Sequence, residues 1–392
     1  MRLHIFNPHT DLALANNREN YMPSANVRRM VCELEMLPMW FAAPGDSILT
    51  TSPTDNIFVE KAKELFGINV NFIDESKAAE HSFSSIEPWG WNVSLRRRLS
   101  NIGIVDQQLP TDEQLANYRS LSGRDKDVEL LNAICGKEGT FQASIINNLE
   151  ECRRYASEYP RCIFKAPWSG SGKGLRWCFG LYDDKSYRWC RRVIEEQGFL
   201  AATPIYDKIL DFALEYHSDG NGGIKFIGYS LFDTNTKGAY RGNILQRPDR
   251  QRETLSKYIP LSTIDNTRES VQKQLKRIYG NKYHGYLGVD MMVCKIGDTY
   301  AIHPCVEVNM RMNMGVLSVI FAERYLADVS RATFMIEYHN EEGYALRRLN
   351  LLCKEHPLCI EDGKIISGAM PLVPIGHSNN YIAYILANIT IR

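Results

Sequence analysis

A turn signal at residues 296–299 separates two strand-like runs, 288–294 and 305–311, and this pair constrains the fold more than any other feature of the sequence. Apolar and polar residues alternate along both runs, which is typical of strands with one buried face. If the Gly-Asp pair at the centre of the turn forms a two-residue loop, the runs pair as an antiparallel hairpin. This register predicts that Asp290 lies opposite Cys305.

Oxygen-bearing side chains are expected on one face of this hairpin. Glu307 is diagonal to Asp290, with about 7–8 Å between their backbones, and Asn309 has the same parity. Carboxylate and amide oxygens, together with nucleotide phosphates, are the usual ligands of Mg²⁺. The sequence therefore predicts a magnesium site, for one ion or two, at Asp290, Glu307 and Asn309. An ordinary solvated strand face is the alternative, and a bulge at Pro304 would shift the register.

Arg311 follows Asn309 by two residues and is expected on the same face. A guanidinium there could hold a transferring phosphoryl group or an acyl phosphate made from it. An arginine considered alone is more often a surface residue, so this interpretation of Arg311 depends on the metal-binding residues predicted beside it.

A glycine-rich loop at 169–174 joins two further predicted strands, 161–166 and 175–179. Its three glycines alternate with other residues, so backbone amides can approach phosphate oxygens without obstruction by a Cβ atom. It is not a Walker A loop, because it joins strand to strand and Lys173 is followed by glycine. Lys165, on the entering strand, could reach the same phosphates, although a flexible hairpin tip remains the alternative. The predicted phosphate-binding residues are Lys165, Ser169, Gly170, Ser171, Gly172, Lys173 and Gly174.

Composition excludes several classes of function. The 392 residues include 46 lysines and arginines and 46 aspartates and glutamates, so no global charge attracts nucleic acid or anionic lipid. The ten cysteines show no CxxC spacing, which argues against a zinc site and fits a reduced, cytoplasmic protein. Apolar segments at both ends are too short for a signal peptide or for a membrane span, which takes about 20 residues.

The pattern of elements changes along the chain. Short apolar runs alternate with helical patterns up to about residue 115, where a helix-capping signal follows a proline, and antiparallel hairpin patterns follow. We therefore predict an α/β domain followed by an α+β region of two lobes with antiparallel sheets. The predicted ranges are 1–115 for the first domain, 116–205 for the lobe with the glycine loop, and 206–392 for the lobe with the metal-binding strands and a C-terminal extension.

Taken in order, these motifs resemble the ATP-grasp superfamily over about residues 120–330, and the run Glu307-Val308-Asn309-Met310-Arg311 is the most specific of them. The N-terminal domain is similar to the α/β domain that precedes ATP-grasp lobes. The resemblance implies that Lys165 contacts nucleotide phosphate, that Asp290, Glu307 and Asn309 hold the metal, and that Arg311 steadies the intermediate. Tyr206 and Asp211, in and after the hinge segment 203–208, are further expected nucleotide contacts. The adenine hinge itself begins at Thr203 or lies at Glu195-Glu196.

The resemblance implies an ATP-dependent, ADP-forming ligase that joins a carboxylate to an amine or a thiol through an acyl phosphate. Its expected partners are ATP, Mg²⁺ and a small-molecule or peptide carboxylate and amine. A nucleotide-binding regulator without ligation chemistry, a phosphotransferase, and a structural protein with coincidental motifs are the alternatives. The segment 240–243 could form a loop over the phosphates. Residues that could contact an acceptor, or could simply cap, pack or lie at the surface, are His9, Asp11, Arg18, Trp89, Trp91 and Arg241.

Overall fold

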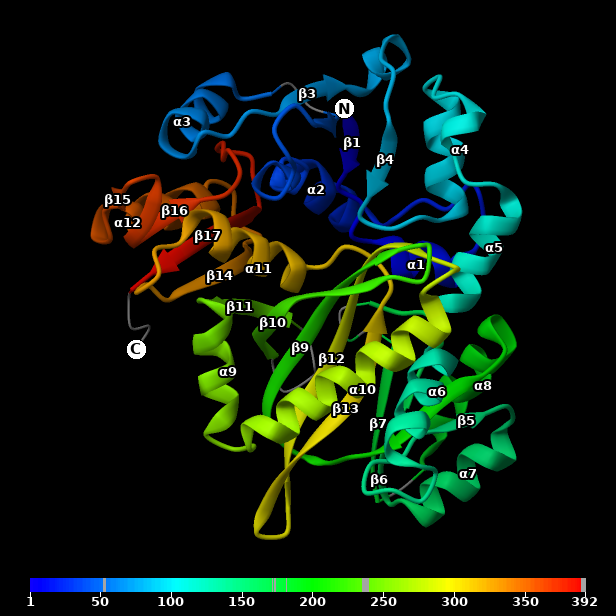
Figure 1. The fold of residues 1–392 in the computed structure, drawn as a ribbon. Coiled ribbons are helices and arrows are strands. Elements are labelled where there is room, and N and C mark those ends of the chain that lie inside the picture. The colour runs from blue at the N-terminus through cyan, green and yellow to red at the C-terminus, as the bar shows by residue number, and fades with distance from the viewer. Residues whose placement is uncertain (52–53, 171, 173, 181, 235–239, 389–392) are drawn as a thin grey trace.

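The computed structural model describes residues 1–51, 54–170, 172, 174–180, 182–234 and 240–388 (Figure 1). Within these residues the strands form a parallel sheet of four strands, an antiparallel sheet of four and a sheet of nine. The predicted combination of an α/β part with antiparallel lobes is confirmed. Among the described residues, no helix combines the length and the apolar character needed to cross a membrane.

The first sheet has the order β3-β2-β1-β4, with every strand parallel to its neighbour. Its strands are β1 (Arg2–Ile5), β2 (Ser47–Thr50), β3 (Asn71–Asp74) and β4 (Ser85–Pro88). The helices around it are α1 (Thr10–Asn16), α2 (Ala25–Leu34), α3 (Asn56–Phe66) and α4 (Val93–Asn101). Thr111 and Gln114 form a capping box at the start of α5 (Asp112–Leu121), where the sequence signalled a new helix. Helix α6 (Arg124–Cys135) then leads into the second sheet.

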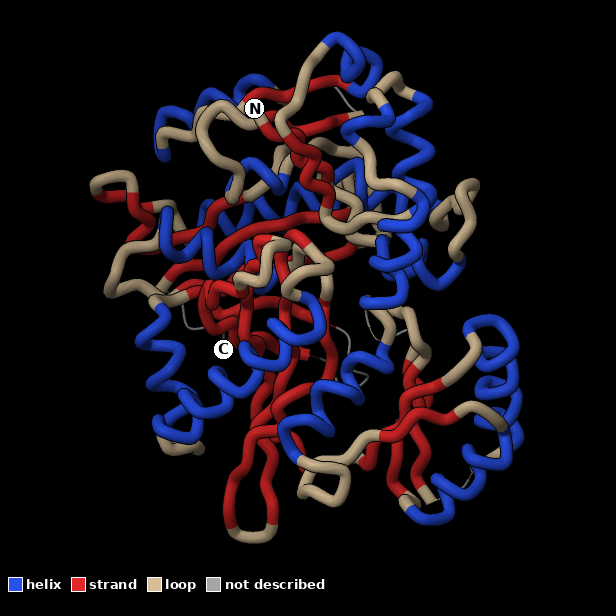
Figure 2. Tube along the Cα trace, turned by 45° about the vertical axis from the view of Figure 1, so that its right-hand side comes forward, coloured by secondary structure: helices blue, strands red, loops and turns tan. Residues whose placement is uncertain are grey.

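The small antiparallel sheet has the order β5-β8-β6-β7. Its strands are β5 (Ser144–Ile146), β6 (Arg161–Lys165), β7 (Leu175–Phe179) and β8 (Leu200–Pro204). Helices α7 (Leu149–Glu158) and α8 (Asp184–Gln197) pack on it through cysteines and aromatic residues. Figure 2 shows this sheet and its helices beside the long strands of the third sheet.

The nine-stranded sheet has the order β13-β12-β9-β10-β11-β14-β17-β16-β15. Its strands are β9 (Asp207–Asp219), β10 (Ile224–Thr234), β11 (Tyr240–Leu245), β12 (His284–Ile296), β13 (Thr299–Asn309), β14 (Ala332–Tyr338), β15 (Cys359–Glu361), β16 (Lys364–Pro371) and β17 (Tyr381–Ala387). Its helices are α9 (Pro248–Ser256), α10 (Leu261–Tyr279), α11 (Met314–Tyr325) and α12 (Tyr344–Glu355). The C-terminal region thus extends the sheet that carries the hairpin.

One loop prediction is wrong. Residues 240–243 belong to β11, which pairs with β10 on one side and with β14 on the other. Backbone hydrogen bonds on both edges hold this segment inside the sheet, so it does not form a loop over the nucleotide.

An aromatic cluster joins the parallel sheet to the nine-stranded sheet. Phe321 on α11 contacts Trp40 at 5.4 Å and Tyr325 at 5.0 Å between ring centroids. Trp40, from the 3₁₀ helix Leu37–Trp40, also donates its indole N–H to the carbonyl of Leu372 at 2.6 Å. The rings lie in one buried cluster that spans both parts of the chain, so packing there fixes one sheet against the other.

Phe321→Ala should lower the free energy of unfolding by about 3–5 kcal/mol, because it opens a cavity among these buried rings. Leu351→Ala is the matched control, since Leu351 is 48% exposed, and it should change stability by less than about 1 kcal/mol. Urea titration of both variants measures the difference. Equal stabilities would show that the cluster does not join the two sheets.

A buried carboxyl group lies on β9, an interior strand of the nine-stranded sheet. Glu215 on β9 is 1% exposed and accepts a hydrogen bond of 3.0 Å from Asn313 Nδ2. A Cβ atom at Gly315 would lie 2.0 Å from its Oε1, and one at Gly288 would lie 2.7 Å from its Oε2. The absence of a side chain at these two glycines therefore leaves the space that the carboxyl group occupies. Burial raises the pKa of Glu215 from 4.5 to about 7.

Because the pKa of Glu215 is raised in the folded state, the unfolded chain releases this proton first and stability falls as pH rises from 4.5 to about 7. Glu215→Gln keeps the acceptor for Asn313 and removes the charge. Its stability relative to the parent should rise by about 2–3 kcal/mol between pH 5 and pH 8, measured by urea denaturation at each pH. Glu196→Gln, at an exposed position on α8, should show no such trend. A flat difference for Glu215→Gln would contradict the raised pKa.

Candidate nucleotide and metal site

A cavity of about 220 Å³ lies between the small sheet and the nine-stranded sheet. The small sheet and its glycine loop contribute Ile163, Lys165, Ser169, Gly170, Gly172, Leu175 and Trp177. The large sheet contributes Asp211, Phe232, Thr234, Asp290, Met292 and Glu307. The cavity therefore brings together the two motifs on which the sequence analysis depended, although more than a hundred residues separate them.

The hairpin forms, but its register near the acids differs from the prediction. Pairing follows the predicted register from the turn as far as Met292 and then shifts, so that Asp290 lies opposite Glu307 and not opposite Cys305. Pro304 lies in the shifted segment, and its nitrogen has no hydrogen to donate to the ladder. The predicted diagonal arrangement was wrong, and direct opposition places the two backbones closer, about 4.5–5.5 Å apart.

Asp290 is in an unfavourable setting for a negative charge. Burial, followed by the nearby carboxylates of Glu307 and Glu215, raises the pKa of Asp290 well above its usual range. Its one hydrogen bond among the described residues comes from Asn309 Nδ2, at 3.1 Å. A cation between Asp290 and Glu307 would remove this repulsion.

The donor set fits a magnesium ion shared with a nucleotide. Within the described ranges, no three His, Cys, Asp or Glu side chains gather as they would around a metal held by protein alone. Asp290 and Glu307 supply two carboxylates, while Asn309 Oδ1 already accepts from Arg311 Nη2 at 2.8 Å. Mg²⁺ is commonly bound by one or two carboxylates with phosphates and water completing its shell. The two acids meet that requirement, and Asn309 orients Asp290 and Arg311.

Arg124, at the start of α6, links the cavity to the preceding helix. Its Nη2 lies 2.8 Å from Glu307 Oε1, its Nη1 lies 3.4 Å from Asp127 Oδ2, and its Nε donates to the carbonyl of Ala166. Asp127 accepts from the backbone N–H of Val308 at 2.8 Å, and burial raises its pKa to about 7. Arg124 and Asp127 thus hold β13 and the loop after β6 in fixed positions.

Lys165 projects from the end of β6 into the same cavity. Its Nζ donates to the carbonyl of Val306 at 3.1 Å, and the residue is 7% exposed. Burial, and then the charge of Arg124, lowers the pKa of Lys165 to about 8. A bound anion such as a phosphate would favour the charged form of the Lys165 amine.

Arg311 is held by the N-terminal part of the chain. Its Nε lies 3.0 Å from both carboxylate oxygens of Asp11 on α1, and its Nη2 lies 2.9 Å from Asp11 Oδ2. Nη1 donates to the carbonyl of Met312 at 3.2 Å. Arg311 is thus next to Asn309 and faces Asp11, within the group of charges around Asp290.

The glycine loop contacts the same group. A Cβ atom at Gly174 would lie 2.1 Å from Ser169, so this position needs glycine, and one at Gly170 would lie 3.2 Å from Asp11 Oδ2, which is a tight approach. The N–H of Ala166 donates to the carbonyl of Gly174 at 2.8 Å. Two predicted contacts of this loop, Ser171 and Lys173, lie outside the described residues.

Tyr206 and Asp211 both line the cavity, Tyr206 just before β9 and Asp211 within its first half. The hydroxyl of Tyr206 accepts from the N–H of Gln142 at 2.8 Å, and Asp211 accepts from Lys208 Nζ at 2.5 Å and from Thr234 Oγ1 at 2.7 Å. Of the two hinge alternatives, the segment after Thr203 borders the cavity. Glu195-Glu196 lies on the exposed side of α8.

Sequence reasoning missed Arg124 and Asp127, and it named Asp11 only among six residues that could contact an acceptor. Asp127 follows Arg124 at a spacing that puts both on one helix face, which is a local signal. Ion pairs of this kind are common on solvated helices, so the signal does not identify a buried site. Two other acceptor candidates, Arg18 and Arg241, are exposed.

No family model matches this sequence, and no curated protein matches it. Solved structures do share its fold. Biotin carboxylase from Campylobacter jejuni superposes with a TM-score of 0.56 at 12% identity, over 98% of this chain and 87% of that chain. The biotin carboxylase domain of the Hydrogenobacter thermophilus 2-oxoglutarate carboxylase gives 0.53 at 12% identity, over 98% and 85%.

N5-carboxyaminoimidazole synthetase from Staphylococcus aureus gives a TM-score of 0.50 at 13% identity, over 99% of this chain and 93% of that chain. At such identities the likeness is one of fold. These neighbours are ATP-grasp enzymes, and the alignments run over nearly all of the chain, the N-terminal sheet included. The chain has the ATP-grasp fold.

Proposed function

We propose that the protein is an ATP-dependent, ADP-forming ligase that activates a carboxylate as an acyl phosphate and transfers the acyl group to an amine or a thiol. The observation that carries this proposal is the direct opposition of Asp290 and Glu307 at the wall of a cavity that also contains Lys165 and the glycine loop. The Hydrogenobacter domain is a complex with MgADP and bicarbonate, which supports ATP and Mg²⁺ as the cofactors here.

The roles of the side chains follow from their places. Lys165 and the amides of the glycine loop bind the phosphates, and Tyr206 and Asp211 contact the nucleotide at the hinge side of the cavity. Mg²⁺, held by Asp290 and Glu307, would neutralise phosphate charge and align the γ-phosphate. Arg124 fixes Glu307 for this task.

In the proposed reaction, a carboxylate oxygen of the substrate attacks the γ-phosphorus and the bond to the β-phosphate oxygen breaks, which releases ADP. The amine or thiol then attacks the acyl carbon, loses a proton and expels inorganic phosphate. Arg311 would stabilise the negative charge of the acyl phosphate, since its guanidinium already binds one carboxylate, that of Asp11. Positioning and charge neutralisation supply most of the catalysis in such a site.

Glu307→Gln should lower the rate of ADP release by about 100-fold or more, because it removes one of two carboxylates that hold the metal. Rapid-quench single turnovers with Mg²⁺-ATP and a panel of carboxylates measure this rate. Glu129→Gln, which alters an acid on α6 that pairs with Lys126 and Arg277, is the control and should keep the parent rate. If Glu307→Gln changed only the ATP affinity, the protein would be a nucleotide-binding regulator.

Arg311→Lys should separate catalysis from nucleotide binding. Lysine keeps the charge but loses the planar fork that can bind two oxygens, so kcat should fall about 100-fold while the Kd for ATP changes by less than about threefold. Fluorescence titration gives the affinity and the quench assay gives the rate. Phosphate recovered on an alcohol or on a histidine, instead of on an acyl group, would show that the protein is a phosphotransferase and not a ligase.

A further inference from the structure

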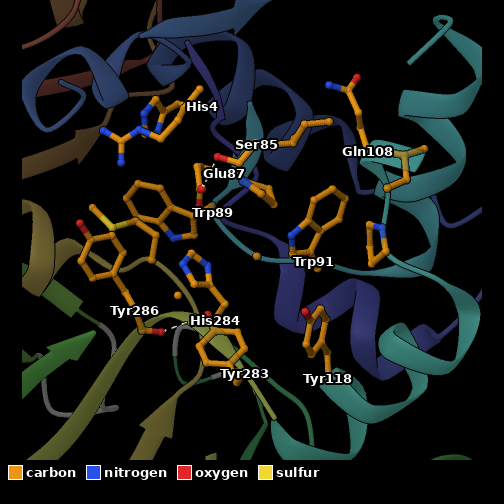
Figure 3. Close-up of a pocket in the computed structure, with 18 of the residues that line it drawn as sticks. His4, Ser85, Glu87, Trp89, Trp91, Gln108, Tyr118, Tyr283, His284 and Tyr286 are labelled. Carbon is orange, nitrogen blue, oxygen red and sulfur yellow. Dashed lines mark hydrogen bonds between the residues drawn. The ribbon is translucent and has the colours of Figure 1, made fainter. Parts of the chain in front are cut away.

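A second and larger cavity, of about 870 Å³, lies between the parallel sheet and one end of the nine-stranded sheet (Figure 3). One wall is β4 with the loop that follows it, and the other is residues 283–286, where β12 begins. Neither the glycine loop nor the acids of the hairpin line it. It is therefore separate from the proposed nucleotide site.

The floor of this cavity is a polar face of the parallel sheet. Arg2 pairs with Ser85 and His4 pairs with Glu87, so these four side chains share one face. Leu3, Ile5 and Ile86, on the other face, belong to a hydrophobic core. Both faces of a parallel sheet are normally covered by apolar packing. A polar face open to a cavity is suited to a ligand.

The charges on this floor leave one carboxylate without a cation. Arg2 lies 3.0 Å through Nε and 2.7 Å through Nη2 from Asp46 Oδ2, and His4 Nε2 lies 3.1 Å from the same oxygen. Glu87 is the one acid among the described residues that line the cavity, and it accepts a hydrogen bond of 2.8 Å from Ser85 Oγ. No described cation pairs with it. Asp46 thus pairs with Arg2 and His4. Arg324, a further cation that lines the cavity, donates to the carbonyl of Ala42 at 2.7 Å. Glu87 is left without an ion pair among the described residues and can bind a positive charge.

Aromatic rings surround this carboxylate. Figure 3 shows Trp89, Trp91, Tyr118 and Tyr286 around the space beside Glu87. The faces of indole and phenol rings attract cations and also pack against flat apolar groups. A carboxylate among such rings is the usual chemistry for recognition of an organic ammonium group.

The cavity ends next to the proposed reaction centre. The N–H of Met312 donates to the carbonyl of Trp89 at 2.8 Å, which attaches the residue after Arg311 to the cavity wall. On the other side, a Cβ atom at Gly90 would lie 2.6 Å from Thr10, the residue before Asp11. The Asp11–Arg311 ion pair therefore lies directly behind the wall formed by Trp89 and Gly90.

We propose that the second cavity binds the amine substrate, as an organic molecule in which a protonated primary amine adjoins a flat apolar group, with Glu87 as the residue that binds the ammonium. The identity of this molecule as the acyl acceptor rests on the ligase function proposed above. Its binding to the cavity does not, because binding requires neither ATP nor Mg²⁺. The small-molecule amine and the amino terminus of a peptide share this chemistry.

Titration of the full chain with 2-phenylethylamine, without nucleotide, tests the proposal by isothermal calorimetry and by the fluorescence of the cavity tryptophans. The amine should bind at least tenfold more tightly than 2-phenylethanol and 3-phenylpropionate, which match its shape without its charge. The tripeptide Phe-Gly-Gly separates the two sources, since tighter binding of the tripeptide than of the amine indicates a peptide amino terminus. Equal affinities for the amine and the alcohol would overturn the proposal.

Glu87→Gln should weaken the amine at least tenfold and leave the alcohol unchanged, while Glu60→Gln, at an exposed acid on α3, should leave both unchanged. Trp91→Leu should weaken both ligands, which tests the ring wall if Glu87→Gln does not fold. An amine affinity that survives Glu87→Gln refutes this inference even if ADP release with carboxylates is normal. Amine binding without any ADP release refutes the ligase and leaves the cavity assignment intact.

Discussion

Two carboxylates that face each other on neighbouring strands determine the arrangement of the site. Asp290 and Glu307 are directly opposed, and burial together with their mutual repulsion disfavours two negative charges. Arg124 pairs with Glu307, whereas the carboxylate of Asp290 receives a single hydrogen bond from the residues that the structure describes, that of the Asn309 amide. In the proposed function, a divalent cation bound between the two carboxylates would offset the repulsion that remains. Lys165, at the edge of the same group, would be the cation closest to the phosphates of a nucleotide in the cavity, whereas Arg311 is already bound to Asp11 and Asn309.

The elements that the sequence predicted well are those whose signals are local. The hairpin of β12 and β13 follows from alternation and from a two-residue turn, and the strands around the glycine loop follow from their short apolar runs. The register was wrong only beyond Met292, because Pro304 cannot donate to the ladder and the pairing shifts there. A proline in a strand signals a bulge, but it does not fix how many residues the bulge inserts.

Long-range contacts could not be predicted in this way. Arg311 and Asp11 are 300 positions apart, and Arg124 reaches Glu307 from a different helix. Glu215 shows the same limit, since its room is created by Gly288 and Gly315, which look like ordinary strand and helix-start residues in the sequence. Each of these residues is of a type that is common in its local element, and only the folded chain shows which of them are in contact. Site residues within one motif were therefore predictable, whereas their supporting partners were not.

The Asp11–Arg311 ion pair connects the two cavities. Arg311 spends three of its donors on Asp11 and Asn309 and another on the carbonyl of Met312, so little of the guanidinium is free. A phosphoryl oxygen that replaced Asp11 on Arg311 would exchange one anion for another, with little change in net charge. Asp11 belongs to the N-terminal α1 and Arg311 follows the hairpin, so such an exchange would alter a contact between the parallel sheet and the nucleotide lobe. Gly170 of the glycine loop lies next to the same carboxylate, so phosphate binding at the loop, as proposed, would be coupled at Asp11 to the position of the N-terminal sheet.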